Sequence, residues 1–139
     1  MEKEQIYDII KSTISKRTDI IFAYIFGSFA TNMDTPLSDI DIAVFHKERK
    51  SAYGYRMIEF EIENQMLHVL PNKKFDVRSL NDAPITITGK ILNEGKLLFF
   101  SNEKFYYDYL VAQRILYMDY MLIYNPLFNE RYENLLNGR

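Results

Sequence analysis

The chain has 139 residues, which is enough to bury one sizeable core and too short for two independent domains, so a single domain over residues 1–139 is expected. Its 17 Lys and Arg against 19 Asp and Glu give a formal net charge of −2, without the basic excess that binding to a phosphate backbone requires. Direct nucleic-acid binding is therefore not expected. A hydrophobic share of 47% with 26% charged residues excludes disorder of the whole chain.

The absence of cysteine excludes disulfides, thiolate zinc sites and a cysteine nucleophile. The longest apolar run, residues 20–26, is far too short to span a membrane, and the opening Met1-Glu2-Lys3-Glu4 is not the start of a signal peptide. We expect a cytoplasmic protein that does not associate with membranes.

The first half of the chain predicts a helix followed by two strands. Isoleucines at helical spacing before residue 18 predict an amphipathic helix: Ile6, Ile9, Ile10 and Ile14. Residues 20–26 are continuously apolar and stop at Gly27-Ser28, as in a strand buried on both faces. After a short polar connection, residues 39–45 begin with polar and apolar residues in alternation, which predicts a second strand.

The second half continues the alternation of helices and strands. A helix is expected over about 53–70, a strand over 75–80, a helix from about Pro84 to a stop at Gly95, a short strand over 97–100 and a long helix over 102–124. The β-branched Ile85-Thr86-Ile87-Thr88 favours a strand locally, but the flanking Pro84 and Gly95 favour a helix. Pro126 ends or kinks the last helix and leaves a short polar tail. This order predicts an α/β (α+β) fold with a small mixed sheet flanked by helices.

Two aspartates open the second predicted strand. Asp39 and Asp41 are two residues apart, so their side chains project from the same face of a strand. Like charges at that distance need a cation between them. A hard divalent ion such as Mg²⁺ fits carboxylate oxygens and shares its coordination shell with substrate phosphates.

The turn before these aspartates is suited to hold phosphate. Gly27 allows a close backbone approach, and the N–H groups and hydroxyl of Ser28 can bind phosphate oxygens. If the second strand folds antiparallel beside the first, Ser28 lies near Asp39. Gly27, Ser28 and Ser38 are therefore the candidate nucleotide-binding residues, with the alternative that Ser38 bonds the backbone at the strand entrance.

A third acid, Asp76, lies on the third predicted strand. Together with Asp39 and Asp41 it can hold two metal ions, one on the triphosphate of a nucleotide and one at the acceptor oxygen. Asp76 can also take the proton of the acceptor. The three aspartates are the candidate catalytic and metal-binding residues.

Gly27-Ser28, Ser38-Asp39-Ile40-Asp41 and Asp76 together resemble the signature of the nucleotidyltransferase superfamily related to DNA polymerase β. The small size and the Gly-Ser-x-Ala start resemble its minimal nucleotidyltransferase (MNT) branch, whose members are typically antitoxins paired with a HEPN-domain ribonuclease toxin. The resemblance implies a polymerase β-like fold with a long C-terminal helix. It also implies transfer of AMP from ATP, with Mg²⁺, to a tyrosine hydroxyl of the HEPN toxin, and a hetero-oligomer with that toxin.

The chain departs from the usual branch pattern at Thr31 and Asn32, where arginine and glycine are common. Asparagine tolerates the left-handed conformation that glycine would supply, so the turn can survive, whereas losing the arginine removes a phosphate contact or a structural ion pair. One alternative that follows is an antitoxin that neutralises its toxin by binding alone. A separate alternative is a nucleotidyltransferase of the same fold that acts on a small hydroxylated molecule.

The remaining candidates concern histidine and tyrosine. His46 and His68 are too far apart in sequence to suggest a metal site, and both are expected to be exposed. The long helix 102–124 carries aromatic residues on more sides than one core can absorb. One interpretation packs a single stripe of them in the core, and the other makes the second stripe a protein interface. The second makes residues 102–124, with the tail 125–139, the candidate partner-binding region.

Overall fold

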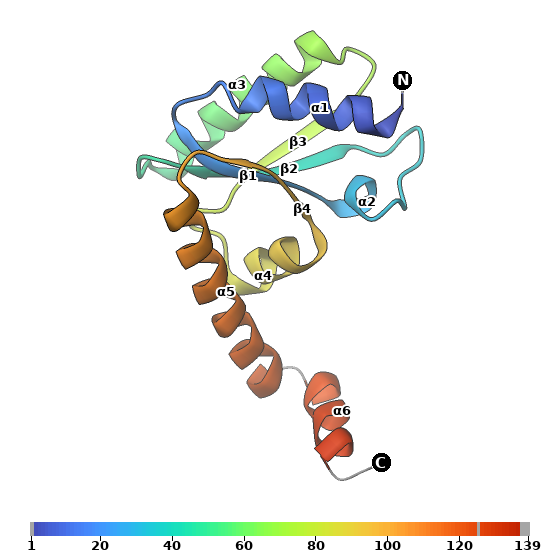
Figure 1. Cartoon of the computed structure of the whole chain (residues 1–139), viewed down its shortest axis with the longest axis vertical. Coiled ribbons are helices and arrows are strands. Elements are labelled where there is room, and N and C mark those ends of the chain that lie inside the picture. The colour runs from blue at the N-terminus through green and yellow to red at the C-terminus, as the bar shows by residue number, and fades with distance from the viewer. Residues whose placement is uncertain (1, 125, 137–139) are drawn as a thin grey trace.

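The computed structural model describes residues 2–124 and 126–136. A four-stranded sheet separates two layers of helices (Figure 1). Helices α1 (Lys3–Ile14) and α3 (Ala52–Val69) cover one face, and α4 (Ile85–Glu94) lies on the other with the first part of α5 (Glu103–Tyr124). The predicted class, a small mixed sheet flanked by helices, is confirmed.

The sheet consists of β1 (Ile20–Phe26), β2 (Ile40–His46), β3 (Phe75–Ser79) and β4 (Lys96–Phe100) in the order β3-β2-β1-β4. Strand β1 pairs antiparallel with both β2 and β4, while β2 and β3 are parallel. The antiparallel pairing of β1 and β2 that the sequence analysis assumed is therefore confirmed. It brings the end of β1 beside the start of β2, with Phe26 opposite Asp41.

Two hydrophobic cores lie on opposite faces of the sheet. Beneath α1 and α3 the isoleucines of α1, including Ile10 and Ile14, pack on Ile25 and Ile42. On the other face an aromatic core surrounds the fully buried Phe22. Because side chains alternate along a strand, Asp41 lies on this second face, in line with Ala43 and Phe45 of the aromatic core.

The predicted elements agree with the structure to within a few residues, including α4, whose β-branched start is overridden by its context. Pro84 precedes the first turn of α4, and Gly95 follows its last residue. The first turn of α5 is capped by Asn102, whose side chain accepts a hydrogen bond from the Phe105 N–H at 3.0 Å. A short helix not predicted from sequence, α2 (Gly27–Ala30), follows β1 directly.

Two sequence-based expectations are wrong. The polar tail after Pro126 contains a further helix, α6 (Pro126–Leu136). His46 is buried, with 1% of its surface exposed, because β2 extends to this residue and Tyr55 of α3 packs against its ring; His68 is exposed as expected. Within the described residues, no helix is long and apolar enough to cross a membrane.

Candidate functional site

The site begins at Gly27, where β1 passes into α2. Gly27 has a φ of 72°, in the left-handed region that favours glycine. A Cβ atom placed here would overlap Oδ2 of Asp41 and lie 3.2 Å from its Cγ. Glycine is therefore required both by the backbone conformation and by the close approach of the Asp41 carboxylate, while a role of Gly27 in phosphate binding stays a prediction.

Asp41 is paired in register with Asp76 on the parallel strand β3. Both carboxylates are half-buried and share one face of the sheet. Burial raises the pKa of the Asp41 carboxyl, and the negative charge of Asp76 and, more weakly, of Asp39 raises it further, while Arg78 opposes the shift. Negative charge at this pair is therefore energetically unfavourable, and a cation bound there would be stabilised.

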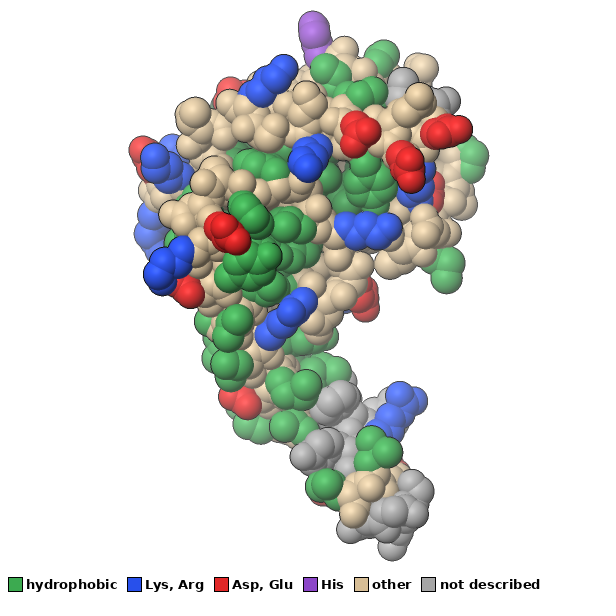
Figure 2. Space-filling model, viewed as in Figure 1, with side chains coloured by type: hydrophobic (Ala, Val, Ile, Leu, Met, Phe, Trp, Pro, Cys, Tyr) green, Lys and Arg blue, Asp and Glu red, His purple; other side chains and the backbone are tan. Residues whose placement is uncertain are grey.

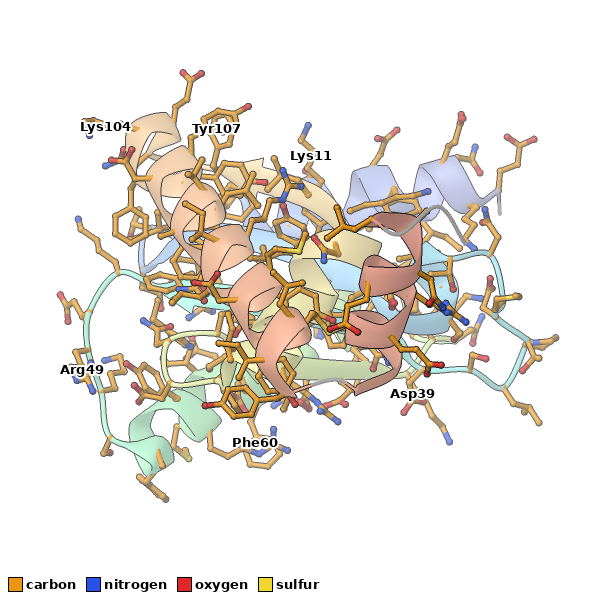
Figure 3. The ribbon with its side chains drawn as sticks, turned by 90° about the horizontal axis from the view of Figure 1, so that it is seen from below. Lys11, Asp39, Arg49, Phe60, Lys104 and Tyr107 are labelled. Carbon is orange, nitrogen blue, oxygen red and sulfur yellow. The ribbon has the colours of Figure 1, made fainter. Side chains whose placement is uncertain are left out.

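Asp39 differs from the other two aspartates in being exposed, just before β2 begins. In Figure 3 it lies at the opposite side of the molecule from Arg49. Across the described ranges 2–124 and 126–136, no three carboxylate or imidazole side chains are grouped closely enough to hold a metal ion. The structure therefore brings together Asp41 and Asp76, while Asp39 would have to turn inward to join them.

The loop between α2 and β2 is held by its own hydrogen bonds. The Ser38 hydroxyl accepts a hydrogen bond from the Thr35 N–H at 2.9 Å and bonds the Thr35 hydroxyl at 3.2 Å. The first of these contacts is the bonding to backbone that was the alternative expected for Ser38. A role of Ser38 in nucleotide binding stays a prediction.

Asn32 has a φ of 60°, so the expectation that asparagine supplies the left-handed conformation is confirmed. The turn closes behind it, because the Met33 N–H donates to the Ser28 carbonyl at 2.8 Å. From α1, Lys3 donates to the Asn32 side chain at 2.9 Å and forms an ion pair with Asp34 at 2.6 Å. Lys3 was not identified from sequence, since an N-terminal lysine carries no signal of a contact about 30 residues away.

Arg78 was also missed. Its Nε donates to Oδ2 of Asp76 at 3.3 Å, and it lies two residues along the same strand, on the same face. The sequence contained this signal, because a cation at i+2 from a strand carboxylate shares its side of the sheet. Arg78 partly neutralises the carboxylate pair.

The donor set fits a magnesium ion. Asp41 and Asp76 are adjacent carboxylates on neighbouring strands, and Mg²⁺ is usually bound by one or two carboxylates while substrate phosphates complete its octahedral shell. The backbone of Gly27 lies against one of these carboxylates, so phosphate held at the turn would reach an ion held by the pair. The arrangement is suited to position a polyphosphate beside a divalent cation.

Comparison with protein families gives a match between residues 8–104 and the family "Polymerase beta, Nucleotidyltransferase". A curated protein of Methanocaldococcus jannaschii, named as a protein adenylyltransferase, is 36% identical over 73 residues, which make up 52% of this chain and 73% of that protein. The matched family range contains Gly27, Ser28 and all three aspartates.

Two solved structures have a similar fold. One is a tri-AMPylated HEPN toxin of Shewanella oneidensis in complex with an MNT antitoxin, with a TM-score of 0.64, 17% identity, and coverage of 94% of this chain and 99% of the matched chain. The other is a toxin–antitoxin complex with AMP-PNP, with a TM-score of 0.65, 17% identity, and coverage of 95% and 99%. At these identities the similarity shows a shared fold, which extends over nearly the whole chain.

Proposed function

Since this chain belongs to the polymerase beta nucleotidyltransferase family, we propose that it is a protein adenylyltransferase of the minimal nucleotidyltransferase type, acting as the antitoxin of a HEPN toxin. Its substrates are ATP and a tyrosine hydroxyl of that toxin. The observation that carries the proposal is the contact between the Gly27 backbone and the Asp41 carboxylate beside Asp76. A phosphate-binding turn and a pair of metal-binding carboxylates meet there.

In the proposed reaction the acceptor oxygen forms a bond to the α-phosphorus of ATP, the bond from that phosphorus to the bridging oxygen breaks, and pyrophosphate leaves. Gly27 and Ser28 hold the phosphates through the backbone N–H groups and hydroxyl of the turn. Asp41 and Asp76, joined by Asp39, would hold Mg²⁺, with two ions expected. When bound, the metal would neutralise charge at the phosphates and at the attacking oxygen.

The proton of the acceptor hydroxyl goes to a carboxylate of the site, and Asp76 is the proposed base. Asp76 is half-buried at the edge strand of the sheet, so an acceptor can approach it from outside the fold. Its contact with Arg78 keeps it oriented before substrates bind.

We propose that the domain spans residues 1–139 and that α5, continued by residues 125–139, forms the toxin-binding region. Helix α5 projects beyond the sheet and carries exposed apolar side chains where it leaves the body, among them Val111 and Ile115, about 58% and 59% exposed (Figure 2). Apolar side chains on a projecting helix are stabilised by packing against a partner.

The test is incubation of the purified chain with the cognate toxin, Mg²⁺ and labelled ATP. We expect the toxin to gain AMP and lose its ribonuclease activity. The double variant Asp39→Ala/Asp41→Ala should transfer no AMP, while Asp82→Asn, an exposed carboxylate paired with Arg49, should act as the wild type. If the double variant still neutralises the toxin in cells without AMP transfer, the protein acts by binding alone; if it still transfers AMP, the metal assignment is wrong.

A further inference from the structure

A pocket of about 290 Å³ adjoins the carboxylate pair on the same face of the sheet. Phe26 and Gly27 at the end of β1 form one side of it, Arg78 of β3 another, and α4 forms the third. Because Gly27 both lines this pocket and lies against Asp41, a group bound at the turn can extend into the pocket. The pocket is therefore continuous with the carboxylate site, and the side chains that line it are candidates to contact the substrate.

The charged residues of the pocket are two cations and one anion. Arg78 and Lys90 provide positive charge from different elements, and Glu94 lies one turn after Lys90 on α4. Within the described residues Lys90 forms no ion pair, and Arg78 is paired only with Asp76. The net positive charge of this lining contrasts with the negative charge of the three aspartates next to it.

The turn that holds phosphate lacks a cation of its own. Residues 27–32 read Gly-Ser-Phe-Ala-Thr-Asn, so they offer N–H groups and hydroxyls only. The nearest lysine on the α1 side, Lys3, is already occupied by Asn32 and Asp34. The cationic side chains available to a triphosphate at Gly27 therefore lie in the pocket, on β3 and α4, and not in the turn.

We infer that Arg78 and Lys90 bind the β- and γ-phosphates of the nucleotide, the part that leaves as pyrophosphate. Arg78 contacts Asp76 in the free chain, and its guanidinium would be released to bind phosphate if Asp76 held a metal ion. Guanidinium binds phosphate oxygens through several charge-assisted hydrogen bonds, and the ammonium of Lys90 acts as a point charge from the opposite wall. The inference rests on the proposed function, because it takes the nucleotide of that reaction as its ligand.

The test measures binding by calorimetry on the full chain without toxin, so that no transfer occurs. The probes are ATP with Mg²⁺, inorganic tripolyphosphate with Mg²⁺, and adenosine. We expect Arg78→Gln and Lys90→Gln each to weaken ATP and tripolyphosphate binding about tenfold, the loss of one charge-assisted contact, and to leave adenosine binding unchanged. Lys90→Arg should retain the wild-type affinity.

Arg49→Gln and Lys104→Gln serve as matched controls, since both residues are exposed and Figure 3 places them on the far side of the molecule from Asp39. They should bind every probe as the wild type does. The inference is overturned if the pocket variants bind ATP normally, or if they lose adenosine as strongly as tripolyphosphate, which would make the pocket a nucleoside site. If the wild-type chain binds ATP and the pocket variants bind it more weakly, but no AMP is transferred, the proposed function is contradicted and this inference stands.

Discussion

At the scale of single residues, the site depends on two residues with positive φ, Gly27 and Asn32, and on the carboxylate of Asp41 that packs against Gly27. Gly27 at 72° and Asn32 at 60° set the entrance and exit of the turn, and Asp41 fills the space that a side chain at Gly27 would need. Gly27 cannot be replaced without moving Asp41. The conformation of the turn and the placement of the carboxylate are therefore coupled.

Asp41→Asn should separate function from stability. The charge of Asp41 is unfavourable in the folded protein, because burial and Asp76 raise the pKa of its carboxyl. We expect the variant to lose AMP transfer by more than about 100-fold while the free energy of unfolding at neutral pH rises by about 0.5 kcal/mol, a small gain because solvent screens a half-exposed group. Urea denaturation without metal measures the stability. A large loss of stability would show that Asp41 has a structural role.

His46 should make stability depend on pH. Burial lowers the pKa of its imidazole, although Asp19 and Glu59 oppose the shift. Its Nε2 lies 2.6 Å from the Ser79 hydroxyl, which donates to Glu59. The unfolded chain therefore takes up a proton at a higher pH than the folded one, so this contribution to stability is present above about pH 6.5, the ordinary histidine value, and is lost as the pH falls below it.

Urea denaturation at pH 7.5 and pH 5.5 measures this dependence. His46→Gln should reduce the difference in unfolding free energy between the two pH values, whereas His68→Gln, at an exposed position on α3, should leave it unchanged. If His46→Gln leaves the difference in unfolding free energy between the two pH values unchanged, the pH dependence of stability comes from carboxyl groups and not from His46.

At the scale of elements, the packing of α5 on α4 depends on a glycine. Gly89 lies in the middle of α4, and a Cβ atom there would overlap the ring of Tyr117 of α5. Nearer the start of α5, Tyr106 is buried and its hydroxyl bonds that of Tyr24 on β1. The contact at Tyr117 therefore sets the direction in which α5 leaves the body, and α4 also carries one wall of the pocket.

Gly89→Ala should destabilise the protein by about 1–3 kcal/mol, the usual cost of overfilling a packed contact, in spite of the better helix propensity of alanine. Thermal unfolding followed by circular dichroism measures the change. Gly54→Ala is the matched control, because Gly54 is also helical and an added Cβ would meet only the neighbouring turn of its own chain, at Lys50 and Ser51. Equal stabilities of the two variants would contradict the packing described for Tyr117.

At the scale of the whole molecule, the nucleotidyltransferase body and the projecting helix have different roles. The body contains the sheet, both cores with the first part of α5, and the site, whereas the rest of α5 extends away from it and is followed by α6 (Figure 1). Exposed apolar side chains continue along α5 to Ile123 and Tyr124, both 69% exposed. In the proposed function the body binds the nucleotide, and the projecting helix would bring it to the acceptor.

Val111→Glu/Ile115→Glu should weaken toxin binding by more than about 100-fold, since two apolar contacts in a protein interface are lost and charges are added. ATP affinity and the thermal midpoint should stay as in the wild type, because both side chains are exposed in the free chain. Tyr53→Glu, at an apolar position on α3 that is also exposed, is the control and should bind toxin normally. Pull-down and calorimetry with the purified toxin measure binding, and normal binding by the double variant would remove α5 from the interface.

Much of the fold and part of the site could be predicted from the sequence, because the signals are local. Helical spacing of isoleucines, the apolar run of β1 and the Gly-Ser turn followed by Asp-x-Asp all depend on neighbouring residues and on the periods of helices and strands. The mixed sheet and the left-handed conformation at Asn32 followed from the same reasoning. Even where local propensity pointed to a strand, at the start of α4, the flanking Pro84 and Gly95 indicated a helix.

Only the tertiary structure decided which distant groups meet. The register of β2 on β3 places Asp41 beside Asp76, the overlap at Gly27 explains the glycine, and the pocket between Arg78 and Lys90 arises because α4 folds back under the sheet. The burial of His46 likewise depends on α3. Such contacts join residues far apart in the chain, so no spacing in the sequence encodes them. The sequence therefore determined the elements and the chemical groups, while packing decided how they are arranged.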